Sequence, residues 1–573
     1  MKKSKVLRNL IIVLLIVVAT VLFLRSRGAA PIESGSTLVL ELEGDYVESP
    51  QPSLLARALG ESQRPFLSLL SRLAIVERDD RIDTVVLVIR PLGMGWGKAE
   101  ELRASIKRLR ESGRKVVAFL DMASFKATRE YFVATAADEI YVVQGGAVPV
   151  VGLAAEYLFL GGLWDKLGVS FDVGKAGKYK SAVEYYTGTD MSAPNREMAS
   201  SLLDSANGAF LEAIAEGRDM SLEAVRVAVD QGPVTPAQLI AQKLIDGVRH
   251  LDGLLDEMPG QVIHADDYAH VDAEDVGFSP VASVALVYGS GSIVQGRASR
   301  SPGGSAVMAS QTFSALIEQV AADPEIDAII LRLDSPGGSA LASEEMWQAL
   351  VTARSHGKPV VASFSDVAAS GGYYVAAAAD SIVSNGGTLT GSIGVFALRP
   401  VLAGTFDKLG IARESMTRGA FADLLLAGEP LSDGARSRLQ GIVLEIYQLF
   451  LERVSEGRGL DISRVDAVAQ GRVWTGRQAF EVGLVDEIGG LHTAVARVRK
   501  RLELDPDSDV ALLIRPAPKS LSEEIAELFN ARVFGLLQAA VPLPEGMRAL
   551  QSILASMPSG GPLLVPPVWV QIH

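Results

Sequence analysis

The sequence contains one pattern of residues twice, and this duplication limits the folds that the chain can adopt. Tyr131–Asp138 recurs 242 residues later as Tyr373–Asp380, with six of the eight residues identical. Asp83 and Asp327, which precede matching apolar runs, lie 244 residues apart. Further matches follow in the same order: Asp165–Gly168 with Asp407–Gly410, Glu216–Arg218 with Glu456–Arg458, and Asp246 with Asp486. We interpret them as an ancestral tandem duplication of a unit of about 220 residues.

Each copy alternates apolar runs with segments of helical periodicity. In the first copy Val85–Arg90 and Val116–Leu120 predict strands, and Lys98–Ser112 between them predicts an amphipathic helix. This alternation predicts an α/β fold made of two tandem repeats. In the second copy an apolar stripe at helical spacing predicts core residues: Leu444, Tyr447 and Phe450. The predicted domains are an anchor at 1–28, a first repeat at 36–258, an acidic linker at 259–281, a second repeat at 282–504 and a tail of unassigned role at 505–573.

The N-terminus carries the signal of a membrane anchor. Four basic residues precede an apolar run, Leu10–Leu24, and Arg25 and Arg27 follow it. The run is short for a bilayer span of about 20 residues. No small-residue cleavage site follows directly, so we expect an uncleaved N-terminal transmembrane helix. The excess of positive charge before the run predicts a cytoplasmic N-terminus, with the rest of the chain across the membrane.

The composition excludes several classes of partner and chemistry. The net charge is −14, whereas a surface that binds nucleic acid needs concentrated positive charge. The chain has no cysteine, which excludes disulfides, thiolate nucleophiles and cysteine-bound metals. Its six histidines are scattered without the spacing of a metal site, which argues against a zinc hydrolase. We therefore expect no metal and no cofactor.

Ser370 is the leading candidate for a nucleophile. The run Pro359–Phe364 predicts a strand and the Ala-rich stretch after Gly372 predicts a buried helix, which places Ser370 at the corner between them. The N–H groups of a first helical turn can stabilise an oxyanion. Gly371 and Gly372 permit the close approach of a substrate backbone. On this stretch alone, a glycine-rich turn before a core helix is the simpler interpretation.

The two copies differ where this chemistry would take place. Ser370–Gly372 aligns with Thr128–Glu130 of the first copy, which has neither the serine nor the glycines. Conversely, Gly177–Ser181 of the first copy aligns with Gly419–Asp423, where both lysines are absent. Each copy therefore retains what the other lacks. A serine nucleophile needs a base, and Lys180 is the candidate because no histidine is suitably placed.

Catalysis makes a physical demand on Lys180. A solvated lysine has a pKa of about 10.4 and is protonated at neutral pH. To act as a base, Lys180 must therefore be desolvated or placed beside donors that favour the neutral amine. Burial against the apolar surface of the other copy is one way to desolvate it. The alternative is that Lys175, Lys178 and Lys180 form a solvated basic loop.

Four motifs occur in order along the two copies: Tyr179–Glu184, Asp334–Ser339, Ala369–Tyr373 and Thr388–Gly394. They resemble the motifs of the signal peptide peptidase A (protease IV) family in its long, duplicated bacterial form. The resemblance implies a crotonase/Clp-protease-like fold in each repeat and a Ser–Lys dyad completed across the repeats. It also implies a homotetramer in the bacterial inner membrane, with its catalytic part facing the periplasm. The implied substrates are cleaved signal peptides and other hydrophobic peptides.

The resemblance also assigns roles to single residues. Ser370 matches the nucleophile of the family, Lys180 matches its general base, and Ser392 matches a serine that orients the lysine. Similarity to Clp-type proteases implies that the backbone N–H groups of Gly338 and Gly371 stabilise the oxyanion.

Two other classes of function stay open at this point. An acyl-CoA hydratase or isomerase would use the crotonase fold, and it predicts CoA binding and glutamate bases. A non-catalytic membrane scaffold predicts that Ser370 does not react with serine-directed probes. Neither class explains why the two copies keep a complementary serine and lysine.

Overall fold

The computed structural model describes residues 31–48, 63–124, 126–298, 307–426, 428–517, 563–564 and 571–572. The predicted anchor at 1–28 and most of the tail after residue 517 therefore lie outside the described residues. Within the described ranges, no helix combines the length and the apolar character needed to cross a membrane.

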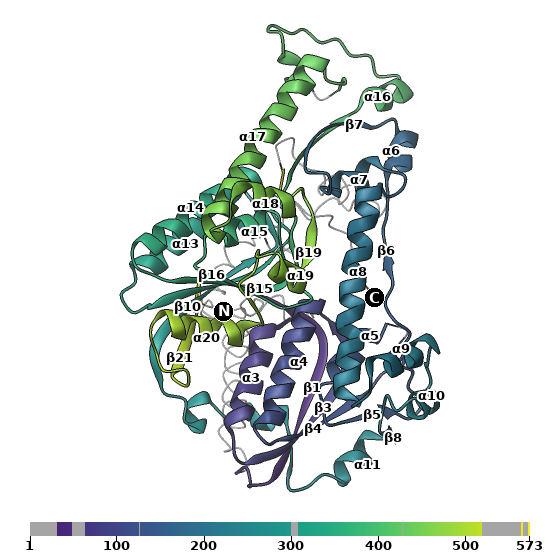
Figure 1. Cartoon of the computed structure of the whole chain (residues 1–573), viewed down its shortest axis with the longest axis vertical. Helices are drawn as coiled ribbons and strands as arrows, with labels where there is room; N and C mark the ends of the chain where they lie inside the picture. Colours follow the sequence, from purple (N-terminus) through teal and green to yellow (C-terminus); the bar gives the residue numbers. More distant parts are fainter. Residues whose placement is uncertain are drawn as a thin grey trace, which may run out of the picture.

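The first repeat is built on a parallel sheet, in the lower part of Figure 1, with strand order β9-β1-β3-β4-β5-β8. Apolar side chains of its central strands form one core with the helices that cover them. The strands are β1 (Ser36–Val47), β3 (Ile82–Gly93), β4 (Lys115–Leu120), β5 (Glu139–Val143), β8 (Gly247–Arg249) and β9 (Val262–His264).

The second repeat is built on a parallel sheet with strand order β21-β10-β13-β15-β16-β20. The order of these six strands corresponds to that of the six strands in the first repeat, which confirms the predicted α/β class and the duplication. Outside the shared set, β2 (Arg64–Pro65) pairs with β1 in the first sheet, and β17 (Leu389–Gly391) and β19 (Val473–Thr475) extend the second sheet beside β15. The strands are β10 (Pro280–Ser290), β13 (Ala328–Ser335), β15 (Val360–Ala369), β16 (Ser381–Ser384), β20 (Glu487–Ile488) and β21 (Asp509–Arg515).

Residues that recur in the sequence make the same contacts in both repeats. The Tyr131 hydroxyl donates a hydrogen bond of 2.8 Å to the carbonyl oxygen of Leu244. Its counterpart, the Tyr373 hydroxyl, donates one of 2.7 Å to the carbonyl oxygen of Leu484. The duplication therefore extends from the backbone to buried polar contacts.

The predicted helix in the first repeat is α4 (Trp96–Glu111), and its counterpart in the second is α14 (Ala340–Ser355). Each has 16 residues. Leu102, Ile106 and Leu109 recur every three or four residues, so α4 buries one apolar face in the core of its repeat. The apolar periodicity of the sequence therefore corresponds to the buried face of this helix.

The long helix α17 (Asp433–Arg458) corrects one prediction. It buries Tyr447 and Phe450 as expected, but Leu444 is 50% exposed, so its assignment to the core is wrong. The buried line along the helix runs through Val443, Tyr447 and Phe450, and Leu444 lies beside this line.

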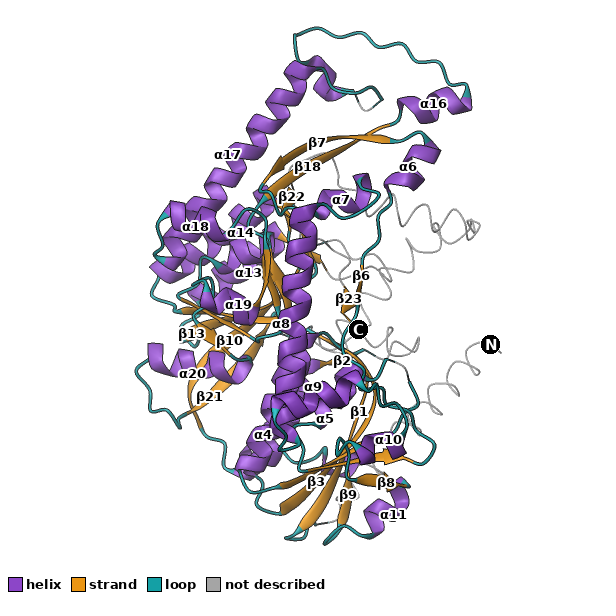
Figure 2. Ribbon diagram, turned by 45° about the vertical axis from the view of Figure 1, so that its right-hand side comes forward, coloured by secondary structure: helices purple, strands orange, loops and turns teal. Residues whose placement is uncertain are grey.

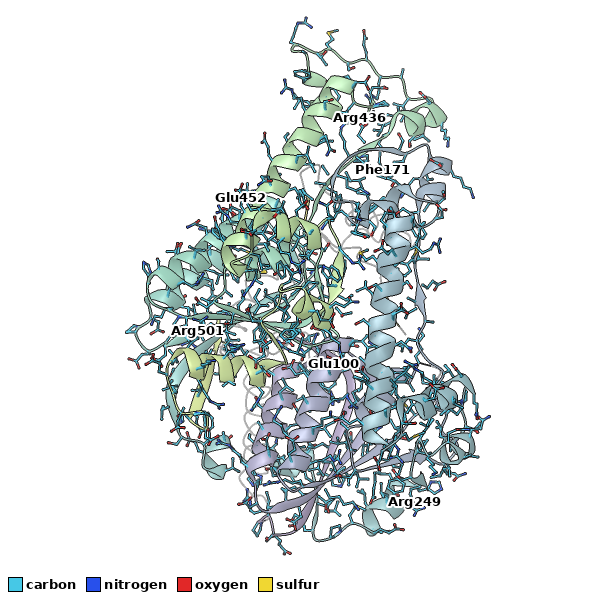
Figure 3. The ribbon with its side chains drawn as sticks, in the orientation of Figure 1. Glu100, Phe171, Arg249, Arg436, Glu452 and Arg501 are labelled. Atoms are coloured by element: carbon cyan, nitrogen blue, oxygen red, sulfur yellow. The ribbon has the colours of Figure 1, made fainter. Side chains whose placement is uncertain are left out.

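The two repeats share a sheet. Strand β7 (Ser170–Ala176) of the first repeat pairs antiparallel with β18 (Val395–Val401) of the second along its whole length. Figure 2 shows these strands together in the upper part of the molecule, and Figure 3 shows Phe171 of β7 near Arg436 of α17. An ion pair of 3.3 Å joins Arg436 to the buried Asp172. The pairing of β7 with β18 brings the segment that leads to Lys180 into the second repeat.

A short strand from the C-terminal tail completes this shared sheet. Strand β22 (Leu563–Leu564) lies between β14 (Gly338–Ser339) and β18, and it is antiparallel to both. In register, Leu564 lies opposite Gly338, and Leu563 lies opposite Phe396. The C-terminal tail therefore pairs with Gly338, one of the two predicted oxyanion donors.

Candidate active site

Ser370 lies at the corner between β15 and the short helix α15 (Gly371–Ala376), as predicted. Its backbone has φ 56° and ψ −116°, a conformation that costs a residue with a side chain on the order of 1–3 kcal/mol. The N–H group of Ser370 donates a 2.8 Å hydrogen bond to the carbonyl oxygen of Gly391, which holds the corner in place. The side chain is fully buried.

Lys180 lies between β7 and α7 (Ala182–Thr187), and it is fully buried in the second repeat. Its Nζ lies 2.8 Å from Ser370 Oγ, 2.8 Å from the carbonyl oxygen of Ser392 and 2.9 Å from Ser392 Oγ. The neighbouring Lys178 is exposed. The interpretation as a solvated basic loop is therefore wrong for Lys180.

Burial lowers the pKa of Lys180 well below its usual range. Among the described residues, the hydrogen-bond partners of its amine are two hydroxyls and one carbonyl, none of which carries a negative charge. An ammonium ion at this position would lack a charged partner in a site shielded from water, so the neutral amine is favoured.

Two glycines hold the backbone of Lys180: Gly177, which begins the lysine segment compared between the two copies, and Gly471. Gly471 has φ 76°, and a side chain on it would come within 2.5 Å of the Lys180 backbone nitrogen. A side chain on Gly177 would come within 2.5 Å of the Gln470 carbonyl carbon. The Tyr179 N–H also donates to the Gln470 carbonyl oxygen at 2.8 Å. Gly471 belongs to none of the recognised motifs, so only the three-dimensional contact identifies it.

The two predicted oxyanion donors lie next to each other. A side chain on Gly371 would come within 3.1 Å of the Gly338 backbone nitrogen. Gly371 opens helix α15, where N–H groups have no partner within their own helix. The structure therefore brings together all five predicted site residues: Ser370, Lys180, Ser392, Gly338 and Gly371.

The site is assembled only once among the described residues. In the first repeat, the helix equivalent to α15 is α5 (Thr128–Ala134), and Glu130 is buried where the second repeat has Gly372. Burial raises the pKa of Glu130, which accepts a 2.7 Å hydrogen bond from the Leu92 N–H. In the second repeat, the counterpart of the lysine loop, residues 419–423, lies at the surface.

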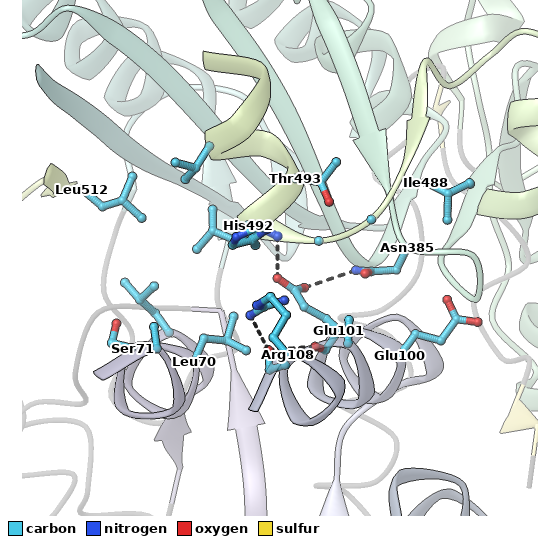
Figure 4. Close-up of a pocket in the computed structure, with 18 of the residues that line it drawn as sticks. Leu70, Ser71, Glu100, Glu101, Arg108, Asn385, Ile488, His492, Thr493 and Leu512 are labelled. Carbon is cyan, nitrogen blue, oxygen red and sulfur yellow. Dashed lines mark hydrogen bonds between the residues drawn. The ribbon is translucent and has the colours of Figure 1, made fainter. Parts of the chain in front are cut away.

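A cavity of about 430 Å³ lies elsewhere, between helices α3 (Phe66–Arg78) and α4 of the first repeat and residues 488–495 of the second (Figure 4). Glu101 reaches across it and accepts hydrogen bonds from the Leu491 N–H at 2.6 Å and the Asn385 amide at 3.2 Å. None of the five predicted site residues lines this cavity. The cavity lies where the two repeats contact each other, and Glu100, which lines it, is labelled in Figure 3.

Comparisons with known proteins identify the family of the chain. Residues 108–262 and 352–505, one segment in each repeat, match peptidase family S49. The chain is 32% identical to the chloroplastic serine protease SPPA of Arabidopsis thaliana, over 92% of this chain and 78% of that protein. It is 30% identical to protease 4 of Haemophilus influenzae, over 76% and 72%. It is also 32% identical to an Enterococcus faecium protein that carries the name signal peptide peptidase SppA, over 34% and 56%.

The two segments that match family S49 together cover more than half of the chain. The alignments with the Arabidopsis thaliana and Haemophilus influenzae proteins each span most of this chain and most of the relative. The assignment of each repeat to a crotonase/Clp-protease-like fold stays a prediction. Hydrolysis by a serine protease is supported over the two alternatives, an acyl-CoA enzyme and a non-catalytic scaffold. The chain belongs to peptidase family S49, a family of serine proteases.

Proposed function

We propose that this chain is a membrane-anchored serine endopeptidase that uses Ser370 as nucleophile and Lys180 as general base. Its substrates would be cleaved signal peptides and other hydrophobic peptides. One observation carries the proposal: a buried lysine amine of the first repeat lies 2.8 Å from a serine hydroxyl of the second.

The hydrogen bonds of Lys180 suit a neutral amine, which has two N–H groups and one lone pair. The two N–H groups can donate to the carbonyl oxygen and the hydroxyl of Ser392, at 2.8 and 2.9 Å. The lone pair then accepts the Ser370 O–H group. Ser392 thereby orients the lysine, and the amine is ready to take the serine proton.

In the proposed reaction, Ser370 Oγ attacks the carbonyl carbon of the substrate peptide bond while its proton moves to Lys180. The N–H groups of Gly338 and Gly371 stabilise the oxyanion. Lys180 then gives the proton to the leaving amine, and the peptide C–N bond breaks to leave an acyl-enzyme ester on Ser370. Lys180 next takes a proton from a water molecule as the water oxygen attacks the ester carbonyl carbon. The bond between this carbon and Ser370 Oγ then breaks, and Lys180 returns the proton to Ser370 Oγ.

The shared sheet supports an extended apolar peptide as substrate. Strand β22 already occupies the gap between β14 and β18 by antiparallel pairing. Its two residues are both leucine, so the chain itself supplies an apolar peptide at this position. A substrate would bind in the same way, by adding a strand beside Gly338. The name of the Enterococcus faecium relative agrees with signal peptides as the substrate class.

The apolar run Leu10–Leu24 supports the remaining parts of the proposal. An anchor at 1–28 would hold the enzyme in the bacterial inner membrane with its catalytic part in the periplasm. There it would reach apolar peptides left in the bilayer. A homotetramer is proposed on the family resemblance.

The test uses the full-length chain in detergent micelles. A fluorophosphonate probe should modify Ser370, as located by peptide mapping, and Lys180→Ala should abolish this labelling. A synthetic signal peptide should be cleaved faster than a polar peptide of the same length. Labelling of a different serine would contradict the catalytic assignment, and faster cleavage of the polar peptide would contradict the substrate class.

A further inference from the structure

A second lysine of the first repeat is buried against the second repeat, close in sequence to neither Ser370 nor Lys180. Lys98, in the first turn of α4, is only 2% exposed. Its Nζ lies 2.7 Å from the Asp334 carboxylate and 2.6 Å from the Asp366 carboxylate. Both aspartates belong to the second repeat.

Asp366 also caps helix α4 across the boundary between the repeats. Its carboxylate accepts hydrogen bonds of 2.9 Å from the N–H groups of Gly95 and Lys98. A side chain on Gly97 would come within 2.2 Å of the Ser365 carbonyl oxygen. The N-terminal end of α4 is therefore held directly against strand β15.

The two aspartates lie on the strands that lead to the reacting groups. Asp366 precedes Ser370 by four residues in β15, and Asp334 in β13 precedes Gly338 by four residues. Asp334 also accepts a 3.1 Å hydrogen bond from the Val367 N–H. A shift of the Lys98 ammonium group would therefore affect the nucleophile strand and the strand that leads to Gly338 together.

The environment of Lys98 is the opposite of that of Lys180. Burial lowers the pKa of Lys98, but the carboxylates of Asp334, Asp366 and Glu48 outweigh this effect and raise its pKa above the usual range. The Asp366 pKa is lowered, chiefly by Lys98 acting against burial. The amine of Lys98 therefore lies between two carboxylates, whereas the hydrogen-bond partners of the Lys180 amine are two hydroxyls and a carbonyl.

The contact is also specific to this arrangement of the two copies. The position 244 residues after Lys98 is Ala342, and the position 244 residues before Asp334 is Arg90. The first copy has kept the lysine and the second the aspartate, as for Lys180 and Ser370.

We propose that Lys98 is a positioning residue, which holds the strands ending at Ser370 and Gly338 in the geometry that hydrolysis requires. This inference rests on the proposed roles of Ser370 and Gly338. It predicts that loss of Lys98 lowers the rate of the chemical step, whereas a contact that only stabilises the fold would change the unfolding temperature alone.

The experiment measures kcat, KM and the unfolding temperature of the full-length chain for two variants, Lys98→Met and Asp366→Asn. The second substitution leaves the side-chain volume almost unchanged. The matched control is Arg103→Met. Arg103 is a buried cation of the same helix, but it donates to the Phe132 carbonyl oxygen within the first repeat. For Lys98→Met we expect kcat to fall about 100-fold, the loss typical of a reacting group displaced by about 1 Å. KM should stay within about twofold, because Lys98 is buried and its amine is bound to Asp334 and Asp366.

Asp366→Asn should lower kcat in the same direction, and Lys98→Arg should recover part of the loss because it keeps the charge. The control should lower the unfolding temperature and leave kcat unchanged. A folded Lys98→Met or Asp366→Asn variant with unchanged kcat would overturn the inference. So would an equal loss of kcat in the control. Lys180→Ala, measured in parallel, separates the two proposals: an active Lys180→Ala enzyme refutes the dyad whatever Lys98→Met does.

Discussion

The Lys180 amine and the Ser370 hydroxyl oxygen lie 2.8 Å apart although 190 residues separate them along the chain. The distance is short because strand β7 of the first repeat pairs with β18 of the second and carries Lys180 into the second repeat. The hydroxyl and the amine are therefore brought together only when both repeats have folded against each other.

Loss of either group should remove hydrolysis. General-base assistance contributes about 10²–10⁴-fold to such reactions, so Lys180→Ala should lower kcat by at least about 100-fold. Ser370→Ala should leave no acyl-enzyme. The matched control is Lys178→Ala, which removes an exposed lysine two residues away and should leave kcat unchanged. Peptide hydrolysis by each purified variant checks this, and full activity in Lys180→Ala would refute the assignment.

The rate should depend on pH through Lys180. Only its neutral form accepts the serine proton, so kcat/KM should rise with pH through the Lys180 pKa and then level off. Because burial lowers this pKa, the plateau should begin well below the pKa of about 10.4 of a solvated lysine. A pH profile of kcat/KM on an uncharged ester substrate measures this. A rate that first levels off near the pKa of a solvated lysine would contradict the buried base.

The stability of the fold should show the same titration. Between the lowered pKa of folded Lys180 and about pH 10.4, the unfolded chain binds a proton that the folded chain does not. The free energy of unfolding therefore rises with pH across this window. Lys180→Met lacks the titrating amine. The unfolding temperature of the wild type should therefore rise relative to that of the variant as pH increases. Thermal unfolding of both proteins in matched buffers tests this, and a constant difference would contradict it.

The duplication made much of the site predictable from sequence. Because the copies could be aligned, the absence of lysines at 419–423 and of the serine at 128 indicated that Lys180 and Ser370 form one site. The corner at Ser370 followed from a β-like run, a glycine pair and an Ala-rich helix. Each of these sequence patterns is local. Comparison of the two copies relates the pattern around Lys180 to the pattern around Ser370.

Other features could not be predicted because they depend on contacts between distant segments. Lys98 and Asp366 lie 268 residues apart and belong to unrelated patterns, so neither suggests the other. The role of Gly471 depends on how closely its backbone approaches Lys180. The exposure of Leu444 reflects the exact direction of the buried line along α17, which periodicity defines only to within one residue.

Gly471→Ala should displace Lys180. The added carbon would come within 2.5 Å of the Lys180 backbone nitrogen and 2.6 Å of its Cβ, so the lysine must move. A displacement of about 1 Å is expected to lower kcat about 100-fold. The matched control is Gly459→Ala, which has a similar φ of 62° but no atom within 4 Å of the added carbon. It should lose about 1 kcal/mol of stability from the left-handed backbone and keep its activity. Equal activity in the two variants would contradict the role of Gly471.

Deletion of residues 562–573 should make the active site more accessible to peptides. Strand β22 pairs with both β14 and β18, so it occupies the position at which we expect a substrate strand to bind. A segment of the same chain competes at a high effective concentration. The deletion should therefore lower KM for an apolar peptide several-fold with little change in kcat, as steady-state kinetics of the two proteins will show. A synthetic peptide with the deleted sequence should inhibit the shortened enzyme competitively, whereas one with both leucines replaced by aspartate should not. An unchanged KM, or the absence of inhibition by the leucine-containing peptide, would mean that substrates bind elsewhere.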